Sequence, residues 1–86
     1  MKLIKLDRRM KGYGDFKYVA KFRRRSEYQK FKEVRKWCWE QWGISSELEL
    51  WDEDDNPAWC WGIEDYELRI YIASDKEAAW YGLKWI

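Results

Sequence analysis

The chain has 86 residues, of which 47% are hydrophobic, 20% aromatic and 38% charged, and its formal net charge is only +1. This length predicts a single domain over residues 1–86 that buries roughly 60% of its unfolded-chain surface, and the aromatic content excludes a disordered tail. The longest apolar runs span a few residues and charges begin near the N-terminus, so we expect neither a membrane span nor a signal peptide, and we expect a cytoplasmic protein.

Two strands are predicted before the first helix. Residues 2–6 predict a short first strand, and the two glycines within residues 11–15 predict a turn. Apolar and mostly cationic side chains then alternate over residues 16–23. Because successive side chains of a strand point to opposite faces, this segment predicts a strand with one apolar face and one mainly cationic face.

A long helix is predicted between Ser26 and Gly43. Ser26 and Gln29 fit a capping box, in which each side chain bonds a free backbone N–H of the first turn, and Gly43 is a typical helix end. Apolar residues at helical spacing predict its buried face, namely Tyr28, Phe31, Val34, Cys38 and Trp42. Trp37 falls at the opposite edge, where we expect partial exposure.

The second half of the chain predicts further strands and a second helix. Alternating or apolar segments predict strands at residues 47–51, 59–63 and 66–72, with an acidic turn at 52–57. The last two of these strands could also form one bent strand. Ser74 and Glu77 fit a second capping box, ahead of a short helix that Gly82 ends, and residues 83–86 predict a short edge strand.

This order of elements predicts an α+β fold. Strands interrupted by two helices favour one antiparallel sheet with one long and one short helix on the same face. A ferredoxin-like split βαβ arrangement with one or two extra strands is the nearest common architecture.

Charge is distributed very unequally along the chain. Residues 1–36 carry 14 basic and 4 acidic side chains, a balance of +10, whereas residues 37–86 carry 3 basic and 12 acidic side chains, a balance of −9. All eight tryptophans lie in the acidic part. The net charge of +1 therefore hides two poles, and each pole offers a candidate binding surface.

The basic pole predicts a nucleic-acid interface. Cationic side chains bind phosphates and interleaved aromatic rings stack on bases, a combination typical of single-stranded nucleic-acid binders. The candidate contacts are Lys17, Tyr18, Lys21, Arg23, Arg24 and Arg25. The alternative is a solvated strand edge and helix face with the aromatic rings in the core.

The acidic pole predicts a protein interface, because exposed tryptophan beside charged residues is typical of interaction hot spots. The candidate contacts are Trp51, Asp52, Asp54, Asp55, Trp59 and Trp61. The alternative assigns the acidic residues to solubility and the tryptophans to a small core, in which we expect Trp42, Trp80 and Trp85 as anchors. Asp52, Asp54 and Asn56 have calcium-loop spacing, but Pro57 and Ile63 replace the required Gly and Glu, so no metal site is predicted.

The chain lacks histidine, which removes the commonest general base and metal ligand. Cys38 and Cys60 have no partner for nucleophilic or zinc chemistry and are interpreted as buried thiols. We therefore expect a protein that is not an enzyme, with no catalytic residue, metal or cofactor.

The C-terminal part resembles the end of small accessory proteins of tailed phages, notably those infecting marine cyanobacteria. The shared features are a strand at 66–72, an acidic capped helix start at 74–77, an aromatic-x-Leu-basic-Trp ending at 81–85, and a preceding Trp- and Cys-rich helix from Phe31 to Gly43. The resemblance implies a non-enzymatic accessory protein that binds another protein, either a factor in the host cytoplasm or its own copies. The opposite poles permit head-to-tail association of such copies.

Overall fold

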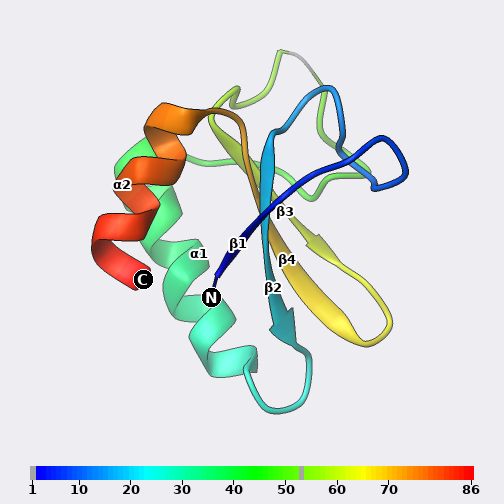
Figure 1. Cartoon of the computed structure of the whole chain (residues 1–86). Helices are drawn as coiled ribbons and strands as arrows, with labels where there is room; N and C mark the ends of the chain where they lie inside the picture. The colour runs from blue at the N-terminus through cyan, green and yellow to red at the C-terminus, as the bar shows by residue number, and fades with distance from the viewer. Residues whose placement is uncertain (1, 53) are drawn as a thin grey trace.

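A four-stranded antiparallel sheet forms the centre of the computed structural model, which describes residues 2–52 and 54–86 (Figure 1). In chain order the elements are β1 (Leu3–Lys5), β2 (Tyr18–Arg23), α1 (Tyr28–Trp42), β3 (Trp59–Ile63), β4 (Glu67–Ile72) and α2 (Asp75–Trp85). The strands lie in the order β1-β2-β4-β3. Because β4 is antiparallel to both β2 and β3, those two strands run in the same direction, with α1 connecting them. The predicted α+β class and antiparallel sheet are confirmed.

Both helices cover the same face of the sheet, as predicted (Figure 1). Phe31, Val34 and Cys38 of α1 and Tyr81 of α2 are buried there together with side chains of the three longer strands. The strand residues of this cluster are Ala20, Phe22, Trp59, Leu68, Ile70 and Ile72. This cluster is the larger of the two cores.

The opposite face of the sheet is covered only in part, and by loops. Leu6 and Phe16, from the β1–β2 loop, bury Val19 of β2, Cys60 of β3 and Tyr71 of β4. Val19 is fully buried, so the cationic face expected for this strand is limited to its second half. A small residue is needed where the loop crosses the sheet, and the predicted turn supplies it. Gly12 has a φ of 87°, and an added Cβ would lie 3.1 Å from the ring of Tyr71.

The prediction of a strand at residues 47–51 is wrong. The segment forms a turn in which the N–H groups of Leu50 and Trp51 both donate to the main-chain oxygen of Glu47 (2.9 and 3.0 Å). This turn places Leu48 and Trp51 on one side, against the second core, and leaves Leu50 76% exposed. Burying a pair three residues apart requires helical rather than extended spacing.

The C-terminal helix continues past Gly82 to Trp85, so the predicted stop and the final strand at 83–86 are wrong. The N–H of Ile86 donates to the main-chain oxygen of Gly82 (3.1 Å), and the Trp85 ring packs edge-on against Trp37 (6.1 Å). Continuing the helix buries part of Trp85, and this contact outweighs the weak helix preference of one glycine.

The two predicted capping boxes have different outcomes. Ser74 is the N-cap of α2, and its hydroxyl donates to the Glu77 carboxylate (2.7 Å) rather than capping a backbone N–H. Ser26 does not cap α1, because Glu27 occupies the N-cap position and its carboxylate accepts the main-chain N–H of Arg23 (2.8 Å). Gly43 ends α1 as predicted, with a φ of 93°.

The expectation for Trp80 is wrong, whereas the partial exposure expected for Trp37 is confirmed. Trp80 is 52% exposed rather than a core anchor, and the exposed tryptophan of α1 is Trp39 (48%). Trp37 is half-buried, since α2 covers that side of α1 and the Trp37 ring packs against Tyr81 and Trp85.

Cys38 and Cys60 are free, buried thiols, as predicted. They belong to cores on opposite faces of the sheet, and burial raises the pKa of both thiols. Within the described ranges, no helix is both long enough and apolar enough to cross a membrane.

Tyr81 provides a test of the larger core. Its hydroxyl is buried without a hydrogen-bond partner among the described residues, and burial raises its pKa. An unsatisfied buried polar group costs about 1–3 kcal/mol, so Tyr81→Phe should leave the free energy of unfolding unchanged or raise it by up to about 2 kcal/mol in urea denaturation. Tyr71→Phe is the matched control and should be destabilising, because the Tyr71 hydroxyl accepts a hydrogen bond from Arg69 (3.2 Å). A clear loss of stability in Tyr81→Phe would contradict this interpretation.

Candidate nucleic-acid interface

The six residues predicted as an acidic protein-binding surface do not form one surface. Trp59 and Trp61 lie on the helix-covered face of the sheet, whereas Trp51 packs on the opposite face. The Trp51 ring contacts Phe16 edge-on (4.8 Å), and its indole N–H donates to the main-chain oxygen of Asn56 (2.8 Å). Trp51 therefore attaches the loop to the sheet.

Trp59 has to be removed from the predicted surface, because its side chain is 0% exposed and cannot contact a partner. Its indole N–H donates to the main-chain oxygen of Gly43 (2.9 Å), which joins β3 to the end of α1. Trp61 is half-buried, and the Arg35 guanidinium lies 4.9 Å from its ring. Alternation with Cys60 predicts the strand correctly, but it does not show that both faces of the strand are covered.

In the acidic turn, two carboxylates accept hydrogen bonds from main-chain N–H groups of the same turn. The N–H of Asp54 donates to the Asp52 carboxylate (2.8 Å), and the N–H of Asp52 donates to the Asp55 carboxylate (2.9 Å). Asp52 and Asp54 are exposed, and Asp55 is half-buried. Within residues 2–52 and 54–86, no group of three or more Cys, Asp or Glu side chains is arranged so that it could hold a metal ion.

Lys17 and Tyr18, at the start of β2, share one partner on α2. The Lys17 ammonium and the Tyr18 hydroxyl donate to the two oxygens of Asp75 (2.9 and 2.6 Å). The hydrogen bond to Asp75 raises the pKa of Lys17 and of Tyr18, and the bonds from Tyr18 and then Lys17 lower the pKa of Asp75. Tyr18 and Lys17 lie about 17 and 20 Å from Arg23 along the strand, so they do not join the arginines in one site.

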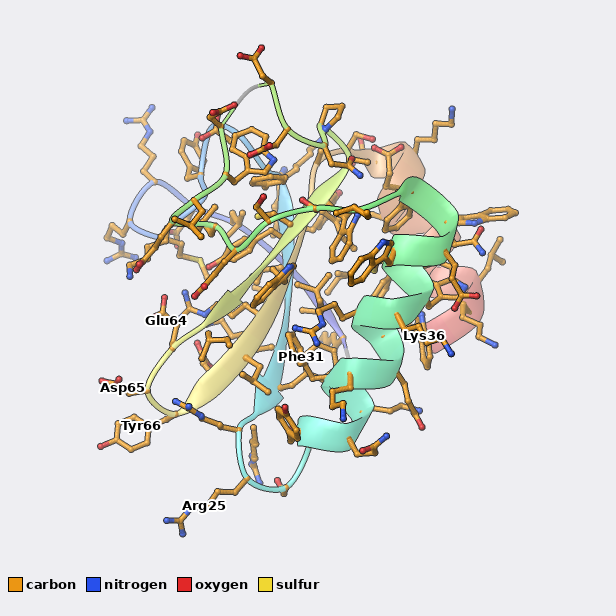
Figure 2. All side chains as sticks on the ribbon, turned by 180° about the vertical axis from the view of Figure 1, so that it is seen from behind. Arg25, Phe31, Lys36, Glu64, Asp65 and Tyr66 are labelled. Carbon is orange, nitrogen blue, oxygen red and sulfur yellow. The ribbon has the colours of Figure 1, made fainter. Side chains whose placement is uncertain are left out.

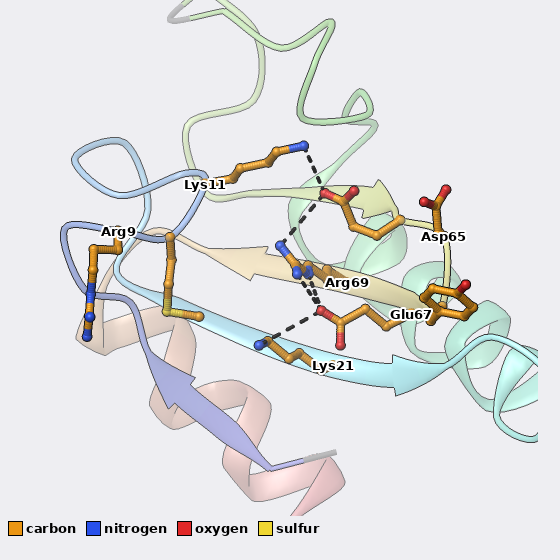
Figure 3. Close-up of a pocket in the computed structure, with 9 residues that line it drawn as sticks. Arg9, Lys11, Lys21, Asp65, Glu67 and Arg69 are labelled. Carbon is orange, nitrogen blue, oxygen red and sulfur yellow. Dashed lines mark hydrogen bonds and ion pairs between the residues drawn. The ribbon is translucent and has the colours of Figure 1, made fainter.

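Lys21 lies in a groove on the uncovered part of the second face (Figure 3). This charged groove has a volume of about 590 Å³ and is lined by Arg9, Met10, Lys11, Lys21, Glu64, Asp65, Tyr66, Glu67 and Arg69. β2 and β4 contribute its floor, and the β1–β2 loop and the β3–β4 hairpin contribute its sides.

Ion pairs hold the floor of the charged groove (Figure 3). The Arg69 guanidinium bonds Glu67 through Nε (2.7 Å) and lies 3.8 Å from the Glu64 carboxylate. Lys11 pairs with Glu64 (3.2 Å), and Lys21 lies 3.9 Å from Glu67. Burial lowers the pKa of Arg69, but its hydrogen bonds outweigh burial and the net pKa is raised. Arg69 is thus a fixed cation at the centre of the groove.

A second depression, the arginine hollow, continues from the charged groove. It has a volume of about 730 Å³ and is lined by Arg23, Arg24, Arg25, Ser26, Asp65 and Tyr66. The N–H of Arg24 donates to the main-chain oxygen of Tyr66 (3.2 Å), which ties the β2–α1 loop to the β3–β4 hairpin. The Tyr66 ring is 89% exposed, and both it and Arg25 project outward at this end of the molecule (Figure 2).

Together the two depressions form what we call the basic surface. They share Asp65 and Tyr66, and their combined lining has seven cationic and three acidic side chains. Within the described part of the chain, the side chains of Arg23 and Arg25 form no ion pair. Four of the six residues predicted for nucleic-acid binding lie here, namely Lys21, Arg23, Arg24 and Arg25.

Four cationic or aromatic residues of the basic surface were not predicted from the sequence: Arg9, Lys11, Tyr66 and Arg69. The first two come from a loop, and the last two come from the part of the chain that is acidic overall. A signal was available at Tyr66, since an aromatic residue next to the acidic pair Glu64-Asp65 at a hairpin tip is placed for exposure rather than for the core.

The surface of α1 extends this pattern beyond the arginines. Tyr28 is 51% exposed with the Lys32 ammonium 5.5 Å from its ring, and Trp39 is 48% exposed beside Lys36 in a further depression. Exposed rings alternating with cations therefore continue along the helix.

Comparisons of the chain with protein-family models, with curated proteins and with solved structures found no match.

The contact between Asp75 and β2 predicts a pH-dependent stability. Folding lowers the pKa of Asp75 from 3.8, so the ionised carboxylate stabilises the folded state at every pH above 3.8. This contribution is lost as the pH falls through the folded-state pKa. Asp75→Asn should therefore be less stable than the parent protein at about pH 7, and the difference should shrink at about pH 3, as measured by urea denaturation. Asp65→Asn controls for the loss of one exposed charge. An equal difference at both pH values would contradict a role for the ionised carboxylate.

Proposed function

We propose that this protein binds single-stranded nucleic acid along the basic surface. The observation that carries the proposal is the convergence of seven cationic side chains on one open surface around the exposed ring of Tyr66. Cations neutralise the phosphates, and an exposed ring offers a stacking platform for a base. The proposed activity is binding, with no catalytic step.

The residues of the basic surface would have distinct roles. Arg23 and Arg25, which are exposed, would contact phosphates, while Tyr66 would stack on an unpaired base. Arg69 is already held by Glu67, so it would offer a preorganised charge in the groove rather than a mobile contact. Carboxylates beside the cations favour a single strand with splayed bases over a duplex, which would present a continuous phosphate surface to Glu64 and Asp65.

The proposal predicts separable effects of two substitutions on binding to a fluorescent single-stranded oligonucleotide of about 12 nucleotides. Arg25→Ala should weaken binding and reduce the slope of log affinity against log salt by about 0.7, because one phosphate contact is lost. Tyr66→Ser should weaken binding by about 5- to 100-fold with the slope unchanged, because stacking releases no counterions. Fluorescence anisotropy at several salt concentrations measures both.

Lys84→Ala, an exposed lysine of α2 outside the basic surface, is the matched control and should bind as the parent protein does. Absence of oligonucleotide binding by the parent protein at low salt would reject the proposal. Equal effects of Arg25→Ala and Lys84→Ala would instead show that only net charge matters.

Protein binding is the second candidate function, and it keeps the resemblance to phage accessory proteins as a prediction. The predicted acidic surface loses Trp59 as a contact, but α2 exposes Trp80 (52%) and Leu83 (81%) on its outer side. Exposed large apolar side chains on a helix favour a protein partner at this surface instead.

The strand order supports a proposal about ancestry of the fold. A ferredoxin-like domain has the element order βαββαβ, and the present order β2-α1-β3-β4-α2 supplies all but its last strand. β1 occupies the sheet edge next to β2, where that last strand would lie. The protein would then be a circularly permuted ferredoxin-like domain whose last strand comes first.

A circular permutant tests the permuted architecture. Residues 1–8 would be moved behind Ile86 through a flexible Gly/Ser linker, with the chain opened between the exposed residues Arg8 and Arg9. The permutant should unfold cooperatively and retain the near-ultraviolet circular dichroism of the tryptophans, because β1 can still pair with β2. A permutant with native helix content but no tryptophan signal would contradict the proposal.

A further inference from the structure

The outer side of α2 carries an apolar strip between two lysines. Lys76, Trp80 and Lys84 are four residues apart in sequence and therefore lie in line on the helix, spanning about 12 Å. All three are exposed, and Leu83 beside them is 81% exposed. α1 contacts one side of this α2 strip, and the outer side of the strip is exposed in the described part of the chain.

Trp80 stands between two depressions of the α2 strip. One, of about 280 Å³, is lined by Trp42, Lys76, Glu77 and Trp80, and the other, of about 230 Å³, is lined by Trp37, Gln41, Trp80, Leu83 and Lys84. The Trp80 indole N–H donates to the Gln41 side chain (3.0 Å), and this bond fixes the ring that lines both depressions. Each depression has the size of one or two apolar side chains, with a lysine at its edge.

A matching knob lies elsewhere on the same chain. Leu50 is 76% exposed in the turn that precedes residues 52–57, although leucine is usually buried. Glu49 precedes it with a side chain that is 76% exposed and lies 3.9 Å from the Lys11 ammonium, and the carboxylates of Asp52 and Asp54 follow on the exposed surface. This acidic knob, defined as Glu49, Leu50, Asp52 and Asp54, combines one apolar anchor with flanking negative charges.

We infer that the α2 strip binds the acidic knob of a second copy of this chain. Leu50 of one copy enters a depression beside Trp80 of the next, and the carboxylates around Leu50 pair with Lys76 and Lys84. The apolar anchor supplies affinity, and the opposite charges set orientation and speed encounter. This inference names a specific partner and does not depend on nucleic-acid binding.

The contact joins two different surfaces, so the association is head-to-tail. A heterologous contact leaves one free knob and one free strip on every assembly unless a ring closes. The average mass in solution should therefore rise with protein concentration and fall with salt, which weakens the lysine–carboxylate pairs.

Two substitutions that replace an exposed leucine by a charged residue test the contact. Leu50→Glu removes the knob and Leu83→Glu removes the strip, and neither disturbs a buried side chain. Each variant should associate with itself at least about tenfold more weakly than the parent protein in sedimentation equilibrium. Ile44→Glu, at a 70% exposed apolar position outside both surfaces and outside the basic surface, is the matched control and should associate as the parent protein does.

A mixture of the two variants gives the decisive result. Leu50→Glu still has an intact strip and Leu83→Glu an intact knob, so an equimolar mixture should form a one-to-one dimer and nothing larger. A parent protein that is monomeric at every concentration at low salt would overturn the inference. It would also be overturned if the mixture stayed monomeric, or if only Leu83→Glu weakened association, which would indicate a symmetric α2–α2 contact or another occupant. Oligonucleotide binding, measured separately, is unaffected by any of these outcomes.

Discussion

The structure depends on covering both faces of one central strand. Leu68, Ile70, Tyr71 and Ile72 of β4 are at most 1% exposed, and they point to both sides of the sheet. The two helices suffice for one face only. Loops must cover the other, and they reach as far as Tyr71, where Gly12 allows the backbone to lie against the ring. The sheet beyond that point stays open, and Lys21, Glu67 and Arg69 replace apolar residues there. The charged groove is therefore a consequence of where the loop cover ends.

The sequence pattern correctly predicted the elements in which buried residues recur at one regular spacing, either alternating or helical. The alternation in 59–63 and 66–72 and the apolar face of α1 correspond to β3, β4 and α1. Prediction failed where tertiary packing, rather than the local pattern, decided between extended and helical backbone. At 47–51 the alternating leucines favour a strand, yet burial of Leu48 with Trp51 requires a turn. At Gly82 a typical stop is overridden by the packing of Trp85. Arg9 and Lys11 could not be predicted in the groove, because only the folded loop brings them beside β4.

The folded chain partly mixes the two charge poles seen in the sequence. Arg69 and Tyr66, from the acidic part, lie beside Lys21 and the arginines of the basic part, and Glu64 and Glu67 are drawn into the same groove. The acidic knob adjoins this basic surface, because the Glu49 carboxylate lies 3.9 Å from the Lys11 ammonium. The folded protein thus carries a basic surface and an acidic knob on neighbouring parts of the chain, and we propose a different partner for each.

The short bridge between Glu47 and Trp61 has a consequence for solubility. β3 is an edge strand, and an unprotected edge offers its free backbone groups to any other extended chain. The N–H of Leu48 donates to the Trp61 main-chain oxygen (2.7 Å), and the Trp61 N–H donates to that of Ser46 (3.4 Å), so the loop occupies the middle of this edge. At the other edge, β1 is only three residues long. Strand addition, the first step toward amyloid-like aggregation, is thus obstructed at both margins of the sheet.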